Sequence, residues 1–316
     1  MSRRRTPALT WEAALDAYET HLRARRASPR TISRYLADLR HLAASLPDRT
    51  PGEVTTEDLR TLQVRLLTGE ASVSRRPLSA ASASRIGSAW RGFFGFLAAE
   101  GRVALDPTVR LEQPRAPRRA PGDALTVKEV ERLLGAFAAT TPASLRDRAI
   151  LEVLYATGLR NAELCALDLA DVDHAEREVT VRAGKGEKGR IVPITRSAHA
   201  RLRDYLDDAR AALASSHPDS GGALFLTARG RRVHGVHLLR LLREAARRAG
   251  MKKNVTPHTL RRTFATALLR NGVNVRVIQV LLGHESLTTT AAYLKLDRSD
   301  LRRELLLRHP RERLEA

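Results

Sequence analysis

A short basic segment, residues 257–262 with the sequence PHTLRR, carries the side chains best suited to chemistry on a phosphate. Proline favours the first turn of a helix, so His258 and Arg261 are expected on one helical face near its N-terminus. An imidazole beside a planar guanidinium at the positive end of a helix suits a phosphate group. A histidine and an arginine in a basic helix are also common on ordinary surfaces. This segment alone therefore does not define a site.

Three other segments contain candidate reactive residues. In ATGLRNAEL, Gly158 is expected to end one helix and Arg160 to stand at the start of the next. AGKGEKGR places Lys185 in a glycine-rich turn, LLGHES contains His284 after a helix-ending glycine, and TTTAAYLKL contains Tyr293. A lone tyrosine in such a helix is ordinarily a half-buried packing residue. A short motif alone does not distinguish that role from a catalytic one. Only the combination of these segments can carry a functional interpretation.

The composition narrows the class of partner. The 316 residues have a formal net charge of +20 and a pI of about 11.3, and such an excess attracts polyanions. Nucleic acid is the first candidate, since neutralising phosphates releases condensed counterions, and an anionic membrane is the competing one. No apolar stretch approaches the roughly 20 residues that span a bilayer, and the basic start of the chain lacks the apolar core of a secretion signal. The one cysteine, Cys165, excludes an internal disulfide or a cysteine-rich zinc site and fits a reducing cytosol.

The length predicts two domains, the first of them helical and covering residues 1–111. Apolar residues recur at helical spacing in residues 10–28, after Ser28-Pro29, in residues 55–67 and in residues 78–101. Residues 112–124 are rich in proline and arginine without apolar periodicity, which indicates an extended linker. The linker either crosses a phosphate backbone or is a solvated hinge with incidental charge.

The second domain is expected over residues 125–316. Helical patterns dominate it, but residues 177–195 have β-branched residues on both sides of a Gly/Lys turn and predict an antiparallel β-hairpin. The last helical pattern, around Leu305–Leu307, lies in the tail. The fold class is therefore mainly α, with a helical N-terminal domain and an α-rich second domain that contains a small antiparallel sheet.

Together, ATGLRNAEL, GKGEKGR, HTLRRTFAT, LLGHES and the later tyrosine resemble, in order and spacing, the catalytic segments of the tyrosine recombinases, or phage-integrase-type enzymes. The resemblance covers roughly residues 125–295, and the Xer-like bacterial branch is the most similar. It implies that residues 1–111 form a SAM-like core-binding domain. Asn161 departs from the apolar residue common there, and Leu-Lys follows the tyrosine where many Xer-type members have Thr-His. The six positions of the family's catalytic pattern fall on Arg160, Lys185, His258, Arg261, His284 and Tyr293.

The resemblance implies a phosphotyrosine mechanism. The planar guanidinium groups of Arg160 and Arg261 can each donate paired hydrogen bonds to the phosphate oxygens, which gain negative charge in the transition state. Tyr293 is the implied nucleophile; because a free phenol has a pKa of about 10, it needs nearby positive charge and a proton acceptor such as His258. Lys185, favoured over Lys188 by its GKG context, is the implied acid for the leaving 5′-oxygen, and His284 is expected to bind a phosphate oxygen. No metal, ATP or other cofactor is expected.

The expected partner is a double-stranded DNA recombination site, clamped between the two domains. The residues considered as phosphate contacts are Arg30, Arg34, Arg85 and Arg91, although each arginine singly is as well explained as a solvated surface charge. The resemblance implies a homo- or hetero-tetramer on two DNA sites, a possible DNA translocase partner, and a cytoplasmic, nucleoid-associated location. The tail helix either docks on a neighbouring subunit or packs on its own domain.

The expected function is therefore site-specific DNA recombination through a 3′-phosphotyrosyl intermediate, as in Xer-like resolution of chromosome or plasmid dimers. Three alternatives stay open from the sequence. They are a mobile-element or phage integrase, an enzyme that relaxes DNA like a type IB topoisomerase, and a non-catalytic DNA-binding protein derived from a recombinase. Plasmid relaxation without site preference would favour the topoisomerase.

Overall fold

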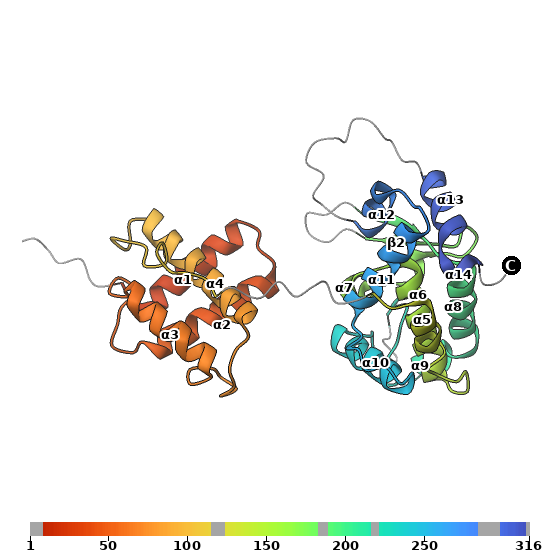
Figure 1. Ribbon diagram of the computed structural model, residues 1–316, viewed down its shortest axis with the longest axis horizontal. Helices are drawn as coiled ribbons and strands as arrows, with labels where there is room; N and C mark the ends of the chain where they lie inside the picture. Colours follow the sequence, from red (N-terminus) through yellow and green to blue (C-terminus); the bar gives the residue numbers. More distant parts are fainter. Residues whose placement is uncertain (1–8, 115–123, 183–188, 216–220, 284–297, 314–316) are drawn as a thin grey trace, which may run out of the picture. The chain divides into compact units, whose positions relative to one another are not determined.

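The computed structural model describes residues 9–114, 124–182, 189–215, 221–283 and 298–313 of the chain. It divides into two compact units, residues 1–120 and 121–316 (Figure 1). Within the described ranges, no helix combines the length and apolar character that a membrane span requires.

The N-terminal unit is built from helices, as the apolar periodicity predicts. Thr10, Ser28, Thr55 and Ser79 each precede a helix, and each side chain accepts a hydrogen bond from a backbone N–H of the first turn. These caps satisfy donors that a helix leaves without an internal partner, so they fix where each helix begins. The helices are α1 (Trp11–Ala24), α2 (Pro29–Ser45), α3 (Thr56–Thr68) and α4 (Ala80–Ala99).

Aromatic side chains form the centre of this unit. Trp90, Phe93 and Phe94 of α4 are almost fully buried, and Tyr18 of α1 meets the Phe93 ring edge-on with centroids 5.5 Å apart. Trp11 stacks on Phe93 at 5.9 Å. Such pairs add to the stabilisation from apolar burial, so the few aromatic residues of the chain hold α1 against α4.

The second unit contains helices and a small sheet. The helix α6 lies at its centre, and Figure 1 shows α8 and α11 beside it. The elements are α5 (Val127–Leu134), α6 (Pro142–Thr157), α7 (Asn161–Ala166), a 3₁₀ turn η1 (Leu169–Asp171), β1 (Val172–Asp173), β2 (Glu178–Val181), β3 (Arg190–Pro193), α8 (Arg196–Asp208), α9 (Arg210–Ala214), α10 (Gly235–Arg248), α11 (Pro257–Arg270), α12 (Val275–Leu282), α13 (Arg298–Arg308) and α14 (Pro310–Arg313).

The predicted hairpin is part of a three-stranded antiparallel sheet with the order β1-β2-β3. In the β2–β3 pair Val179 lies opposite Val192, and Val181 lies opposite Arg190. The additional strand β1 pairs Val172 with Val179. It has only two residues, too few for an alternating pattern to be visible in the sequence. Residues 183–188, which join β2 to β3, lie outside the described residues.

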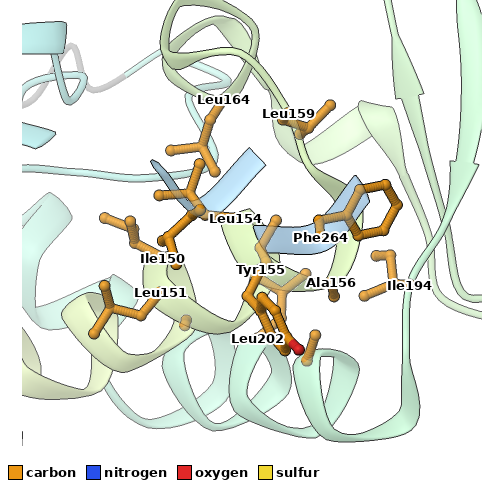
Figure 2. Close-up of a cluster of buried hydrophobic side chains, with 14 of the residues drawn as sticks. Ile150, Leu151, Leu154, Tyr155, Ala156, Leu159, Leu164, Ile194, Leu202 and Phe264 are labelled. Carbon is orange, nitrogen blue, oxygen red and sulfur yellow. The ribbon is translucent and has the colours of Figure 1, made fainter. Parts of the chain in front are cut away.

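The core of the second unit is aliphatic and surrounds α6. Figure 2 shows Ile150, Leu154 and Ala156 of this helix gathered with Leu202 of α8 and Phe264 of α11. Every residue from 149 to 157 is buried, so α6 is enclosed on all sides rather than being amphipathic. This buried helix leads into the loop in which Arg160 stands.

Two short helices each follow a longer one in this unit. The chain breaks at Ala209 between α8 and α9, where Arg210 Nη2 donates to the Ala223 carbonyl at 2.6 Å. The tail helix α13 ends at Arg308, because Pro310 has no N–H to continue its hydrogen bonding and begins α14 instead.

The described part of the tail packs on its own unit. Leu305 of α13 is fully buried in the core around α6. His309 is fully buried between the rings of Tyr155 and Phe264, with centroids 5.1 Å and 5.7 Å away. Arg311 donates to the Glu152 carboxylate at 2.5 Å. Of the two arrangements that the sequence left open, this structure has the one in which the tail lies on its own domain.

Candidate active site

The C-terminal end of α12 is the point at which distant parts of the second unit converge. Helices leave their last carbonyl groups without internal partners and carry partial negative charge at this end, so cationic donors are favourable there. Three guanidinium groups each donate to one of three consecutive carbonyls at this end. The groups come from the start of α7, the start of β3 and the second turn of α11. The bonds join Arg190 Nε to Leu281 O at 2.9 Å, Arg261 Nη2 to Leu282 O at 2.6 Å and Arg160 Nη2 to Gly283 O at 2.7 Å.

Arg160 and Arg261, which the sequence paired in one site, are indeed brought together. They donate to adjacent carbonyls of the same turn, although 101 residues separate them in the chain. Arg160 is the N-cap residue of α7, and its side chain is 31% exposed. Arg261 is only 8% exposed. The two guanidinium groups together form a positively charged site, which is open to solvent on the Arg160 side.

Gly158 makes the approach of α11 to the loop after α6 possible. It ends α6 with a φ of +61°, and a Cβ there would lie 2.5 Å from Cδ1 of Phe264. Its carbonyl accepts a hydrogen bond from Arg261 Nη1 at 2.8 Å. A glycine is required because the backbone is left-handed and a ring from α11 occupies the space of a side chain.

Glu163 and Arg190 belong to the same cluster, although neither was predicted from the sequence as a site residue. Glu163 Oε1 accepts from Arg160 Nη1 and from Arg190 Nη1, both at 2.8 Å. Oε2 accepts from the Arg160 backbone N–H at 2.7 Å and from Arg190 Nη2 at 2.8 Å. The sequence signal was the acidic residue three positions after a helix start, which is the second half of a capping box. Arg190 had no local signal, because all its partners are distant in the chain.

The electrostatics of Glu163 follow from these contacts. Burial by itself raises the pKa of this carboxyl. The hydrogen bonds from the Arg190 side chain and the Arg160 backbone N–H, the charge of Arg190 and the hydrogen bond from the Arg160 side chain together lower the pKa to about 2. The carboxylate is thus charged at any physiological pH. It holds two guanidinium groups that would otherwise repel each other at the end of α12.

His258 stands at the start of α11, as the sequence predicted. Thr256 caps the helix, Pro257 opens it, and His258 is exposed while Arg261 on the next turn is buried. The imidazole is accessible to a ligand that approaches this helix end. The remaining candidates, Lys185, His284 and Tyr293, lie outside the described residues.

Cys165 packs against the core of the second unit. Its thiol is half-buried and donates to Asn161 Oδ1 at 3.4 Å, and burial raises its pKa to about 11. A protonated thiol is a weak nucleophile. Asn161, the polar residue in a place expected to be apolar, also donates to the Gly235 carbonyl at 3.4 Å and so joins α7 to α10.

The four arginines of the N-terminal unit that were considered as phosphate contacts differ in their surroundings. Arg30 and Arg34 of α2 are exposed. Arg85 of α4 forms an ion pair with Asp38 of α2, and exposed Arg91 donates to the Leu111 carbonyl at 3.3 Å. The structure therefore gives Arg85 a partner within the unit.

No cluster in the described ranges gathers three or more His, Cys, Asp or Glu side chains that could hold a metal ion. The chemistry available from the described site is anion binding by guanidinium groups beside an imidazole. Such a site can stabilise the negative charge that develops when a phosphodiester is attacked.

Two family models match the chain. The phage integrase family model covers residues 123–299, and the model of the phage integrase N-terminal SAM-like domain covers residues 15–101. Tyrosine recombinase XerD of Mycobacterium tuberculosis is 40% identical over 307 residues, which are 95% of this chain and 98% of that protein. Tyrosine recombinase XerC of Mycobacterium sp. strain JLS is 37% identical over 305 residues, 95% of this chain and 99% of that protein.

A lambda integrase tetramer bound to a Holliday junction shares the fold, with a TM-score of 0.68 and 21% identity over 90% of this chain and 76% of that one. The matched models together span both units, and the relatives match over nearly their whole length. The chain therefore belongs to the phage integrase family, the tyrosine recombinases.

Proposed function

We propose that the chain catalyses site-specific DNA recombination in the manner of the Xer recombinases, by cutting and rejoining strands through Tyr293. The observation that carries the proposal is the convergence of Arg160 and Arg261 on the end of α12. Two guanidinium groups fixed by backbone carbonyls can neutralise the non-bridging oxygens of one phosphate without reorganising when the reaction begins.

The proposed reaction conserves the phosphodiester bond energy. The Tyr293 oxygen attacks the scissile phosphorus, its proton passes to His258, and the bond from phosphorus to the 5′-oxygen breaks. Lys185 protonates the departing 5′-oxygen, and His284 hydrogen-bonds a non-bridging oxygen. The products are a 3′-phosphotyrosyl link and a free 5′-hydroxyl. Attack by the 5′-hydroxyl of another strand reverses these steps, so neither ATP nor a metal is needed in this scheme.

We further propose the division of the chain and its assembly. Residues 1–111 would serve as a core-binding domain, residues 112–124 as a linker, and residues 125–316 as the catalytic domain. Two domains on one duplex, and four copies on two DNA sites, fit the lambda integrase tetramer seen on a Holliday junction. Similarity to XerD and XerC over nearly the whole chain favours a role in resolving chromosome or plasmid dimers. This proposal places the protein in the cytoplasm, at the nucleoid, and gives it a second recombinase or a DNA translocase as possible partners.

A nicked duplex whose 5′-hydroxyl fragment diffuses away after cleavage tests the reaction. Wild-type protein should remain covalently attached to the 3′ end, and Tyr293→Phe should abolish this trapping while DNA binding persists. Tyr35→Phe, at a partly buried tyrosine of the N-terminal unit, is the matched control and should trap normally. Trapping that survives Tyr293→Phe would refute the nucleophile.

The Xer role needs its own test. Plasmids that carry two directly repeated copies of the sequence protected by the protein on genomic DNA should be resolved into two circles. Relaxation of plasmids without any site preference would instead support a topoisomerase activity. Binding without cleavage of any nicked substrate would support a non-catalytic DNA-binding role.

A further inference from the structure

Arg190 joins three elements of the second unit with one side chain. It begins β3, its side chain is 11% exposed, and its three described hydrogen bonds use all three guanidinium nitrogens. Nη1 and Nη2 donate to the two oxygens of Glu163 in α7, both at 2.8 Å, and Nε donates to the Leu281 carbonyl of α12 at 2.9 Å. The chain separations are 27 residues to Glu163 and 91 residues to Leu281.

The backbone next to Arg190 is shaped to admit this guanidinium. Gly283 ends α12 with a φ of +65°, and a Cβ at that position would lie 2.9 Å from Arg190 Nη1. The plane of the guanidinium therefore lies close against the glycine whose carbonyl accepts from Arg160 Nη2. Arg190 and Arg160 contact the same residue from two elements.

We propose that Arg190 is a positioning residue for strand cleavage: through Glu163 it sets the orientation of Arg160, and through Leu281 it fixes the end of α12. This inference rests on the proposed function, in which Arg160 binds the scissile phosphate. Without Arg190, two of the four hydrogen bonds to the Glu163 carboxylate are lost. The carboxylate can then turn toward Arg160 and draw its guanidinium away from the Gly283 carbonyl.

Lysine cannot replace Arg190 in this role. The three bonds require donors that lie in one plane and point in different directions, which a guanidinium provides and an ammonium on a flexible chain does not. Arg190→Lys keeps the positive charge, so it tests geometry rather than charge. Misplacement of a catalytic group by about 1 Å can slow a reaction about 100-fold, so the effect should appear in the chemical step.

A matched control exists near the N-terminal end of α6, the end opposite to the one that precedes Arg160. Arg146 is only 4% exposed, donates through Nε and Nη2 to Asp147 at 2.8 Å and 2.6 Å, and donates through Nη1 to the Leu226 carbonyl at 3.1 Å. It therefore combines one carboxylate with one distant carbonyl, as Arg190 does. Within the described residues, its hydrogen-bond partners do not include Arg160, Glu163 or α12. Arg146→Lys therefore measures the effect of weakening a buried arginine network that does not include the candidate active site.

The experiment compares single-turnover cleavage of the nicked duplex at saturating protein, together with DNA affinity and melting temperature. Arg190→Lys should cleave about 10- to 100-fold more slowly than wild type, with DNA affinity within about twofold. Arg146→Lys should cleave at close to the wild-type rate even if its melting temperature falls equally. Cleavage by Arg190→Lys at the wild-type rate, or equal slowing in Arg146→Lys, would overturn the proposal. Wild-type protein that never cleaves would instead refute the proposed function.

A double-mutant cycle keeps the proposal testable if Arg190→Lys folds poorly. Arg190→Met removes the guanidinium, Glu163→Gln removes the carboxylate charge, and the combined variant leaves no unpaired charge between them. If Arg190 acts through Glu163, the slowing in the double variant should be smaller than the product of the two single effects. Slowing equal to that product would show that Arg190 does not act through Glu163.

Discussion

The arginines considered for DNA contacts in the N-terminal unit differ from those of the second unit in how their guanidinium groups are held. In the N-terminal unit, Arg30 and Arg34 are exposed and Arg85 is paired with one aspartate. In the second unit, Arg190 and Arg261 are largely buried and donate to backbone carbonyls at the end of α12. An exposed guanidinium samples many positions, whereas a backbone acceptor fixes one. Buried carbonyl acceptors, rather than the number of charges, therefore distinguish a preorganised anion site from a generally basic surface.

The largest expected effect tests whether the fixed arginines act in cleavage. Arg261→Lys keeps the charge but cannot donate simultaneously to the carbonyls of Gly158 and Leu282 and to a phosphate. Single-turnover cleavage of the nicked duplex should fall by about 10²- to 10³-fold. Arg85→Lys in the N-terminal unit should cleave at close to the wild-type rate on saturating DNA. Equal losses in both variants would remove the distinction between the units.

The second prediction compares two glycines that end helices with nearly the same backbone. Gly101 after α4 has a φ of +64° and open space around it, whereas Gly158 after α6 has a φ of +61° and faces Phe264. Gly101→Ala should cost about 1–2 kcal/mol, the strain of a left-handed alanine. Gly158→Ala adds the clash inside a packed core and should cost about 3–4 kcal/mol.

Two spectroscopic signals separate these effects. Both tryptophans, Trp11 and Trp90, belong to the N-terminal unit, so their fluorescence follows that unit alone, while circular dichroism follows both. Gly101→Ala should shift denaturant unfolding in both signals. Gly158→Ala should shift the circular dichroism curve and leave the tryptophan curve in place. Equal costs at the two glycines would show that the Phe264 contact relaxes.

The third prediction concerns buried His309, which the tail places against Tyr155, Phe264 and Arg311. Burial lowers the pKa of His309 from 6.5 to about 4. Between these values the unfolded chain binds a proton that the folded chain does not. The free energy of unfolding of the second unit should therefore fall as the pH drops from about 6.5 to about 4, by at most about 1.4 kcal/mol per pH unit, and then level off.

The matched variant for this prediction is His309→Gln, which cannot titrate. Denaturant unfolding followed by circular dichroism at several pH values should show a shallower slope for the variant between about pH 4 and 6.5. The tryptophan signal of the N-terminal unit should be the same in both proteins. An unchanged slope in the circular dichroism signal would mean that His309 does not remain neutral when the second unit is folded.

The same contrast explains how much could be read from the sequence. Apolar periodicity and capping residues predicted α1 to α4 closely, because those signals are local. They also placed Arg160 at the start of α7 and His258 with Arg261 at the start of α11. The resemblance of the motifs to the catalytic segments of the tyrosine recombinases then placed the two arginines in one site.

What could not be predicted depends on contacts between distant segments. Arg190 appeared as an ordinary residue after a turn, because its partners Glu163 and Leu281 come from α7 and α12. The strand β1 is too short to show alternation. The break at Ala209 has neither glycine nor proline to announce it, and it coincides with the bond from Arg210 to a distant carbonyl.

The smallest expected effect concerns the exposed arginines of the N-terminal unit. Arg34 is exposed on α2, whereas Arg85 is paired with Asp38. If Arg34 contacts a DNA phosphate, Arg34→Ala should reduce the slope of log affinity against log salt concentration by about 0.9. Arg85→Ala should leave that slope nearly unchanged, because its charge is already neutralised within the protein. Binding titrations over a series of salt concentrations measure both slopes. A smaller slope for Arg85→Ala and an unchanged slope for Arg34→Ala would contradict this prediction. The ion pair between Arg85 and Asp38 would then have to open so that Arg85 could contact DNA.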